Sequence, residues 1–305
     1  MKTVFVINPA AGKMAGNDNL KSKIESAARN KNADFEIYTT KSVGDAERFV
    51  RDYPCDATEL CFVACGGDGT LSEVVTGSID RKDCLIAVLP IGTGNDFCRN
   101  FCQNEIEEIF DGHTVDCDAI KCTLINRDTK KVLYCANMIN IGFDCNAADL
   151  CSRMKTKPFI SGTLAYVLSV FVMLIRKKGA DVSIDADGNL HRGRLLLATF
   201  ANGCFCGGGF RSNPYASVTD GLINVNIIKN VTRRKFISLL PSYKNGTFVS
   251  KKGIEKLLTA GFYRKVSVKS LKGQLKVCID GEIHFGTEMT FEAIPACFAF
   301  VGKRK

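Results

Sequence analysis

The chain has 305 residues, of which 46% are hydrophobic and 24% charged. This composition excludes a disordered protein and suits one large or two smaller globular domains. The net charge is +9, and the basic residues occur in small clusters. These clusters form either solvated faces or surfaces that attract an anionic membrane or a polyphosphate. No nucleic-acid-binding motif accompanies them.

The first third of the sequence alternates strand-like and helix-like segments. Residues 2–7 form a β-branched strand that ends in turn residues at positions 8–13, and a strand followed by small residues and glycine recurs at Gly66 and Gly92. Between the first two turns we expect a helix at residues 20–29, a strand at residues 35–38 and a second helix from about Ala46. This alternation predicts a mostly parallel sheet, with the three turns at the edge where such sheets bind ligands.

The glycine-rich loop at residues 65–73 is the strongest motif of this region. It lies between an apolar strand, residues 60–64, and a segment that can open a helix, residues 71–75. Strand, glycine-rich turn and helix is typical of phosphate binding, because glycine lets a phosphate approach the backbone amides. Asp68 would repel a bare phosphate, so we expect it to hold Mg²⁺ against a nucleotide; the alternative is a tight turn closed by an Asx hydrogen bond.

A second glycine loop follows the next buried strand, residues 85–89. In residues 90–97 two glycines flank Thr93, whose hydroxyl can donate to a phosphate. Asn95 and Asp96 are expected to cap a helix that continues through Phe101. A capped helix after a turn would explain this segment alone, but together with the loop at Gly66 it favours a phosphate site.

From about Thr114 the sequence changes to short strands separated by turn signals, which predicts a second, β-rich domain of sandwich or barrel type. The expected strands are residues 117–125, 132–141, 181–184, 195–201, 222–228, 266–268, 275–279, 289–291 and 297–301. Residues 159–175 are almost uncharged and have basic flanks. Because a membrane-spanning helix needs about 20 residues, we interpret this run as a buried helix over the sheet.

Two further segments of the second half have features of a site. A glycine cluster at residues 202–211 predicts a flexible loop, and Asp220 lies in a turn where it is either a hairpin residue or an oxygen ligand for a hard cation.

Asp280 and Glu282 are a candidate pair of carboxylates near the end of the chain. If the strand at residues 275–279 continues, the two side chains project from one face about 7 Å apart, and this closeness raises the pKa of one of them. A general base with a supporting carboxylate is what phosphoryl transfer to a hydroxyl requires. The alternative is a β-turn with Gly281 at positive φ.

The 15 cysteines are scattered, mostly inside apolar runs, which is typical of reduced thiols in a cytosolic protein. No CxxC pair occurs and there are 3 histidines, so zinc is not favoured. The chain begins with a strand and without a signal-peptide pattern, and we therefore expect a cytoplasmic protein.

Taken together, these motifs resemble those of the bacterial diacylglycerol kinase-like lipid kinases, the family that includes sphingosine kinases, over essentially the whole length. The resemblance rests on residues 8–12, 66–70, 90–97, 207–209, 220–222 and 280–282, in the order of the family. It implies an α/β, Rossmann-like ATP-binding domain at residues 1–116, joined by a last strand at about residues 294–305. An all-β, sandwich-like domain for the lipid substrate would occupy residues 117–293.

The resemblance also implies residue roles. Glu282 would be the proton acceptor, with Asp280 and Asp68 as further catalytic carboxylates, and Asp116 looks like the family aspartate that orders them. A structural Mg²⁺ would lie near Ser217, Asp220 and Leu222, partly held by backbone carbonyls. Contacts to ATP would come from Asn8, Pro9, Ala10, Ala11, Gly12, Thr40, Gly66, Gly67, Asp68, Gly69, Thr70, Leu71, Ser72, Glu73, Gly92 and Thr93.

Two positions depart from the family pattern. Ser72 stands where the family usually has asparagine. This replacement puts one hydrogen bond of the loop in doubt. Asn224 stands where a second aspartate is frequent, and the lost negative charge predicts weaker Mg²⁺ binding.

The sequence thus predicts an ATP- and Mg²⁺-dependent lipid kinase in which Glu282 accepts the proton of a lipid hydroxyl, such as that of diacylglycerol, as it attacks the γ-phosphate. Such an enzyme of phospholipid metabolism would meet its substrate peripherally at a membrane, helped by its basic excess. The sequence is compatible with a homodimer and does not determine the oligomeric state.

Two alternatives remain. An NAD kinase shares the Gly-Gly-Asp-Gly loop and a β-rich partner domain, but residues 90–97 and 280–282 argue against it. A catalytically silent nucleotide-binding regulator is suggested by Ser72 and Asn224, and the combination of Asp68, Asp280 and Glu282 argues against it.

Overall fold

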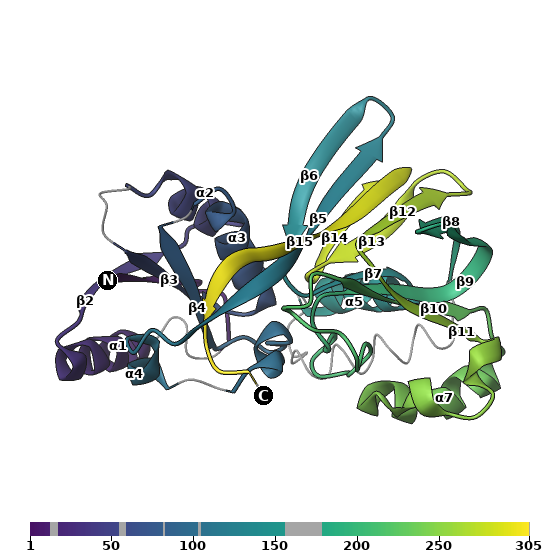
Figure 1. Cartoon of the computed structure of the whole chain (residues 1–305). Helices are drawn as coiled ribbons and strands as arrows, with labels where there is room; N and C mark the ends of the chain where they lie inside the picture. Colours follow the sequence, from purple (N-terminus) through teal and green to yellow (C-terminus); the bar gives the residue numbers. More distant parts are fainter. Residues whose placement is uncertain (13–17, 55–58, 82, 103–104, 156–178, 305) are drawn as a thin grey trace. The chain divides into compact units, whose positions relative to one another are not determined.

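The computed structural model describes residues 1–12, 18–54, 59–81, 83–102, 105–155 and 179–304 (Figure 1). The chain divides into two compact units, Met1–Asp118 with Ala296–Lys305, and Ala119–Pro295. The helix expected at residues 159–175 lies outside the described residues. Among the helices that are described, none is long and apolar enough to cross a membrane.

The first unit is built on a parallel sheet. Its strands are β1 (Lys2–Ile7), β2 (Asp34–Thr39), β3 (Leu60–Gly66), β4 (Cys84–Pro90) and the end of β15 (Glu288–Val301), in the order β15-β4-β3-β1-β2. Its helices are α1 (Asp18–Lys31), α2 (Asp45–Asp52), α3 (Asp68–Ser78), α4 (Ile106–Ile109) and the 3₁₀ helix Phe97–Asn100. The pairs β1–β2, β1–β3, β3–β4 and β15–β4 are all parallel, as the alternating pattern predicted.

The register of these strands aligns their carboxyl ends. Ile7 is paired with both Thr39 and Cys65, and Cys65 is paired with Leu89. The loops that follow β1, β2, β3 and β4 therefore begin at the same level of the sheet. Helices α1 and α4 cover one face and α2 and α3 the other (Figure 1).

The second unit is mostly antiparallel. Its strands are β5 (Thr114–Asn126), which starts in the first unit, β6 (Thr129–Cys135), β7 (Met138–Gly142), β8 (Ala180–Ala186), β9 (Asn189–Ala201), β10 (Ile223–Lys229), β11 (Leu258–Tyr263), β12 (Lys265–Ser270), β13 (Leu275–Ile279), β14 (Glu282–Gly286) and the first part of β15. Pairing runs in the order β14-β13-β7-β9-β8-β12-β15, with β10 between β9 and β11, and β5 beside β6. The inward-facing side chains, among them Phe200 and Phe291, form one core, as expected for a sandwich.

Two helices of this unit were not predicted, α5 (Phe143–Lys155) and α7 (Arg233–Asn245). Pro241 inside α7 is a helix breaker in sequence terms, yet the helix continues past it. Thr232 caps α7 by accepting from the amide of Lys235, and Gly246 ends it at positive φ.

Two predicted strand boundaries are wrong. The segment 132–141 is not one strand, because β6 ends at Cys135 and β7 begins at Met138. The segments 289–291 and 297–301 are instead parts of β15, which continues through Pro295 and the left-handed Ala296 (φ 46°). The amide of Ala296 donates to Asp118 Oδ1 at 2.9 Å, and this contact accommodates the local irregularity.

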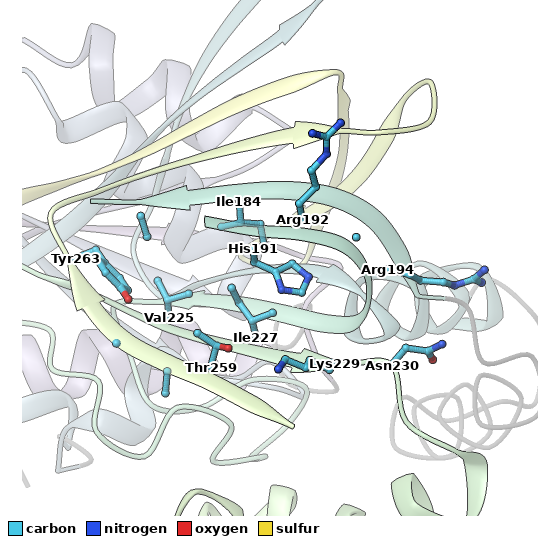
Figure 2. Close-up of a pocket in the computed structure, with 14 residues that line it drawn as sticks. Ile184, His191, Arg192, Arg194, Val225, Ile227, Lys229, Asn230, Thr259 and Tyr263 are labelled. Carbon is cyan, nitrogen blue, oxygen red and sulfur yellow. The ribbon is translucent and has the colours of Figure 1, made fainter. Parts of the chain in front are cut away.

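A cavity of about 630 Å³ opens between strands β8, β9, β10 and β11 of the second unit (Figure 2). Ile184, Val225 and Ile227 line it and also belong to the buried core of the sandwich. The cavity is therefore continuous with the hydrophobic interior of this unit.

Candidate functional site

The loop after β1 is tied to the start of helix α3 by Asn8. Its Nδ2 donates to Thr70 Oγ1 at 3.1 Å, its backbone amide donates to the carbonyl of Cys65 at 3.1 Å, and its Oδ1 accepts from the amide of Ala10 at 2.9 Å. One side chain thus fixes both the first turn and the glycine loop beside it.

Three glycines allow these loops to touch through their backbones. A Cβ on Gly92 would lie 2.4 Å from the Cα of Gly67, and the amide of Gly92 donates to the carbonyl of Gly66 at 3.1 Å. A Cβ on Gly12, which has φ 63°, would lie 2.0 Å from the carbonyl oxygen of Ile91. These glycines are therefore needed for loop packing, whether or not a ligand is bound.

The amino end of helix α3 has the properties of a phosphate site. Gly67 is its N-cap and carries no side chain that could satisfy the first amides, and the first hydrogen bond of the helix runs from Leu71 to Gly67 at 3.1 Å. A Cβ on Gly69 would meet no atom within 4 Å, so the space beside this turn is open. The amides and the helix dipole together suit the charge of a phosphate.

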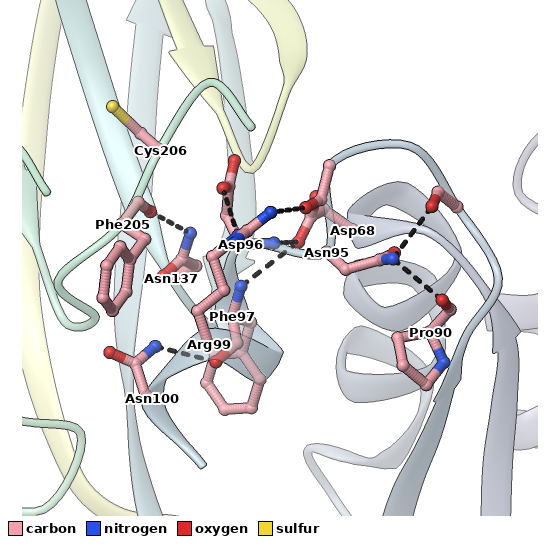
Figure 3. A network of polar contacts seen from close by, with 12 residues as sticks. Asp68, Pro90, Asn95, Asp96, Phe97, Arg99, Asn100, Asn137, Phe205 and Cys206 are labelled. Carbon is pink, nitrogen blue, oxygen red and sulfur yellow. Dashed lines mark hydrogen bonds and ion pairs between the residues drawn. The ribbon is translucent and has the colours of Figure 1, made fainter. Parts of the chain in front are cut away.

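Asp68 joins the two glycine loops. Its Oδ1 accepts from the amides of Asp96 and Phe97 at 2.7 and 3.2 Å (Figure 3). Burial raises the pKa of Asp68, and the backbone hydrogen bonds partly oppose that rise. Asp68 therefore has a structural role that the sequence did not indicate, and its other oxygen, Oδ2, is the one that could face a cation.

The expected capping by Asn95 and Asp96 is wrong. Asn95 Nδ2 donates to the carbonyls of Pro90 and Gly92, each at 2.8 Å, and Asp96 makes no capping hydrogen bond (Figure 3). The 3₁₀ helix Phe97–Asn100 is capped instead by Asp68, because the loop geometry brings a residue 29 positions earlier to the amide of Phe97.

Glu73 contacts the neighbouring helix. Its Oε1 accepts from the amide of Gly44 at 2.8 Å and its Oε2 from that of Ala46 at 3.1 Å, so it caps α2. Thr40, also expected to contact ATP, is buried, and its amide donates to the carbonyl of Ile7 at 2.9 Å. The structure thus gives both residues a role in supporting the loops.

The remaining predicted contacts differ in exposure. Pro9, Ala10 and Thr93 are exposed, Ala11 and Ser72 are half-buried, and the side chain of Leu71 is buried. Thr93 can therefore offer its hydroxyl to a ligand, whereas Leu71 can offer only its backbone.

In the second unit, Asp280 is a buried acceptor with several donors. Its Oδ1 accepts from the amides of Asn137 and Met138 at 3.1 and 2.9 Å and from Cys135 Sγ at 3.1 Å, and its Oδ2 accepts from the amide of Ala136 at 2.7 Å. Burial raises the pKa of Asp280, opposed by these hydrogen bonds. This carboxylate binds the bend between β6 and β7, and it explains why the expected strand is broken there.

The extended geometry of Asp280 and Glu282 is wrong, and the alternative, a β-turn with Gly281 at positive φ, is confirmed. Strand β13 ends at Ile279, which pairs with Glu282, and the two residues between them have φ 45° and 93°. Both positive values, with the sequence Asp-Gly, indicate a type I′ hairpin turn. The two carboxylates therefore do not share one strand face, and the pKa of Asp280 is raised by burial, not by Glu282.

Glu282 begins β14 with its side chain 45% exposed, and His284 lies two residues further on the same strand face. The Nε2 of His284 is 3.7 Å from Glu282 Oε2. Burial, and then the charge of Lys131, lower the pKa of His284 to about 4, so the imidazole is neutral at pH 7. Glu282 and His284 are two residues apart, and in a strand this spacing places both side chains on one face. That spacing is the sequence signal that could have indicated the pair.

The proposed cation ligands form a turn. Leu222 donates its amide to Asp220 Oδ1 at 3.0 Å, and Ser217 Oγ lies 3.4 Å from Thr219 Oγ1. These oxygens are of the kind that Mg²⁺ prefers, and Asp220 is exposed. Within the described part of the chain, no group of three or more His, Cys, Asp or Glu side chains is arranged to hold a metal ion.

Asn224 is part of a buried polar chain. Its Oδ1 accepts from Asn213 Nδ2 at 2.9 Å, its Nδ2 is 3.5 Å from the carbonyl of Gly261, and Asn213 Oδ1 accepts from Thr199 Oγ1 at 2.7 Å. An aspartate at this position would direct a carboxylate oxygen at a carbonyl. The amide is therefore suited to its place in the core.

Two other predicted features are placed as follows. Asp116 is exposed, whereas Asp118, two residues later, is buried and accepts from Ala296. The glycines of residues 207–209 all have positive φ and form a turn closed by Cys206 and Phe210, which exchange backbone hydrogen bonds of 2.9 and 2.8 Å.

Comparison with known proteins agrees with these two folds. Residues 2–122 match the model of the diacylglycerol kinase catalytic domain, and residues 137–302 match the model of the YegS C-terminal NAD kinase beta sandwich-like domain. The two units that the structure describes thus match the two domain models of one kinase family. The chain belongs to the diacylglycerol kinase-like family of lipid kinases.

Two relatives illustrate the match. A protein of Stenotrophomonas maltophilia called "Probable lipid kinase YegS-like" is 27% identical over 93% of this chain and 91% of its own. A diacylglycerol kinase of Bacillus subtilis is 26% identical over 91% of this chain and 88% of its own.

Solved structures show the same fold. A diacylglycerol kinase from Bacillus anthracis str. Sterne superposes with a TM-score of 0.69, with 19% identity and 99% and 97% of the two chains covered. Yeast NADH kinase, solved with NADH, gives a TM-score of 0.54 at 11% identity, over 99% of this chain and 84% of its own.

Proposed function

We propose that the protein is an ATP- and Mg²⁺-dependent kinase that transfers the γ-phosphate to the hydroxyl of a lipid alcohol such as diacylglycerol. The observation that carries the proposal is the amino end of α3, which has no side-chain cap and has open space beside Gly69. The loops around it are fixed by Asn8 and Asp68, so the phosphate cradle is formed before a ligand arrives.

In this proposal the chain contributes positioning and charge. The amides of residues 67–70 bind phosphate oxygens, and Thr93 donates a hydrogen bond from the neighbouring loop. When bound, Mg²⁺ would neutralise phosphate charge and align the transferred group. Asp68 Oδ2 is the candidate ligand, direct or through water, for this nucleotide-bound cation. The oxygens of the turn at Asp220 are candidates for a separate, structural Mg²⁺.

Glu282 is the proposed proton acceptor, because its carboxylate is exposed and can reach a hydroxyl. Asp280 holds the hairpin that carries Glu282 against the bend between β6 and β7. Its buried position makes it a positioning residue in this scheme.

The test is transfer of labelled γ-phosphate from ATP to detergent-dispersed lipid alcohols, with NAD as a further acceptor. Glu282→Gln is expected to lose transfer while keeping ATP binding and Tm, and Glu292→Gln, an exposed glutamate of β15, is the matched control. Phosphorylation of NAD would instead support an NAD kinase-like enzyme. ATP binding without transfer to any acceptor would support the silent regulator.

We further propose that the protein docks peripherally on anionic membranes through α7. The buried face of this helix includes Phe236 and Leu239, whereas its outer face carries Ile237, 54% exposed, with Arg233, Arg234 and Lys244 around it. Spacings of three, four and seven residues place these side chains on one side of the helix. No residue of α7 is acidic. An apolar side chain among cations suits the surface of an anionic bilayer.

Cosedimentation with vesicles tests this docking surface. Binding is expected to require anionic lipid, to weaken with salt, and to fall roughly 5-fold in Ile237→Ser, because about half of an isoleucine side chain would no longer be buried. Val132→Ser changes another exposed aliphatic residue, on β6, and should leave binding unchanged. Binding that is indifferent to both anionic lipid and Ile237 would exclude this surface.

A further inference from the structure

The cavity between β8 and β11 changes from apolar to basic along its length. Val225, Ile227 and Lys229 follow each other on one face of β10, at the two-residue period of a strand. The first two are buried and Lys229 is exposed. In Figure 2, Tyr263 lies at the apolar end and Arg194 and Asn230 lie at the end of Lys229.

The strand register supports this gradient independently of the view. Ile223 pairs with Tyr263 of β11, which places the tyrosine near the start of β10. At the other end of β10, Lys229 pairs with Leu195 of β9, the residue next to Arg194. The apolar and basic ends of the cavity are therefore fixed by the sheet itself.

The charge at the basic end is all positive. Lys229 is on the same face as the apolar lining, Arg192 and Arg194 border the cavity from the other face of β9, and none of the described residues that line it carries a carboxylate. Asp181, which is opposite Arg194 in the register of β8 and β9, lies 3.4 Å from the ammonium group of Lys272. The cations of the cavity thus have no anionic partner within its walls.

His191 adds an unsatisfied polar atom in the middle of the cavity. It is paired with Ile184 across β8 and β9 and faces the same interior, and its Nε2 is buried with no hydrogen-bond partner among the described residues. Burial, and next the charge of Lys229, lower the pKa of His191. A buried polar atom without a partner is costly, and a ligand oxygen could satisfy it.

We infer that this cavity binds a single-chain amphiphile with an anionic head, either a carboxylate or a phosphate monoester. The acyl chain would lie over Val225 and Ile227, and the head would contact Lys229 and His191, which the register places on the same face of the sheet. A volume of about 630 Å³ suits a small amphiphile. A neutral lipid would leave the cations and the imidazole without partners, and a small inorganic anion would leave the apolar half unfilled.

This site goes beyond the proposed kinase reaction. The residues that line the cavity include none of those assigned above to ATP, to the cation or to proton transfer. Binding can therefore be measured without ATP, and its outcome is separate from that of the phosphoryl-transfer assay.

Titration calorimetry of the full chain tests the inference with four probes: decanoate and decyl phosphate below their micellar concentrations, monodecanoylglycerol, and inorganic phosphate. We expect one molecule of decanoate or decyl phosphate to bind per chain, and the better of the two identifies the head group. The neutral ester and inorganic phosphate should each bind at least 10-fold more weakly.

Lys229→Ala should weaken binding of the better anionic probe at least 10-fold. Lys265→Ala is the matched control, because its side chain is exposed, lies in the same unit and is outside the cavity lining. A thermal melt of each variant verifies folding. Equal binding of the neutral ester, equal binding of inorganic phosphate, no binding of either anionic amphiphile, or equal losses in the two variants would each overturn the inference.

Discussion

Replacing Gly69 with alanine separates the stability of helix α3 from the role of its amino end. The added Cβ meets no atom within 4 Å, so the methyl group fits the free protein. Because alanine loses less conformational entropy than glycine on helix formation, we expect the free energy of unfolding to rise by about 0.5 kcal/mol and Tm by about 1–2 °C.

The same methyl group would occupy the space that a phosphate needs beside the first amides of α3. An added methyl in a packed site costs about 1–3 kcal/mol, which corresponds to a roughly 5- to 150-fold higher KM for ATP. The variant should therefore be more stable and bind ATP less well. Loss of stability alone cannot produce this combination.

Gly77 in the same helix is the matched control. A Cβ there would lie 2.5 Å from the carbonyl oxygen of Glu47, so Gly77→Ala should lower Tm and leave the KM for ATP unchanged in the folded fraction. The assays are thermal melts with and without ATP, and initial rates against ATP at fixed lipid. A Gly69→Ala protein with raised Tm and an unchanged response to ATP would refute a phosphate site at α3.

Two further predictions concern the hairpin of Asp280. Asp280→Asn should lower the free energy of unfolding by about 1–3 kcal/mol, because asparagine keeps one acceptor oxygen and its Nδ2 cannot accept from the backbone N–H of Ala136; an unchanged Tm would contradict the structural role of Asp280. The imidazole of His284 should titrate near pH 4 by NMR, and an apparent pKa above 6 would refute its burial. Since its pKa is depressed in the folded state, the stability that His284 contributes is present above about pH 6.5 and lost as the pH falls toward 4.

The parallel sheet and its loops could be predicted because their signals are local. Alternating strands and helices, with Gly66 directly after residues 60–65 and Gly92 two residues after Pro90, define which strand ends carry the loops. The resemblance to lipid kinases follows from the same short motifs, and the family matches confirm it.

The contacts that shape the candidate site could not be predicted from local sequence patterns. Asp280 breaks a strand more than 140 positions earlier, and Asp68 caps a turn almost 30 positions later. Both are aspartates in Asp-Gly sequences, which predict a turn but do not indicate which amides the carboxylate will accept. The prediction divided strand β15 into two short strands. Pro295, a residue that usually ends a strand, lies between them, and only the distant Asp118 shows how Ala296 is accommodated.

The return of strand β15 to the first unit has a consequence for protein synthesis. Phe298 and Phe300 pack with Phe97 in an aromatic cluster, and Phe300 pairs with Ile86 of β4. A ribosome that has completed Asp118 needs roughly 10–40 s to reach these residues. Until then the apolar edge of β4 has no neighbour from β15, so nascent chains and C-terminally truncated products should depend on chaperones and aggregate readily.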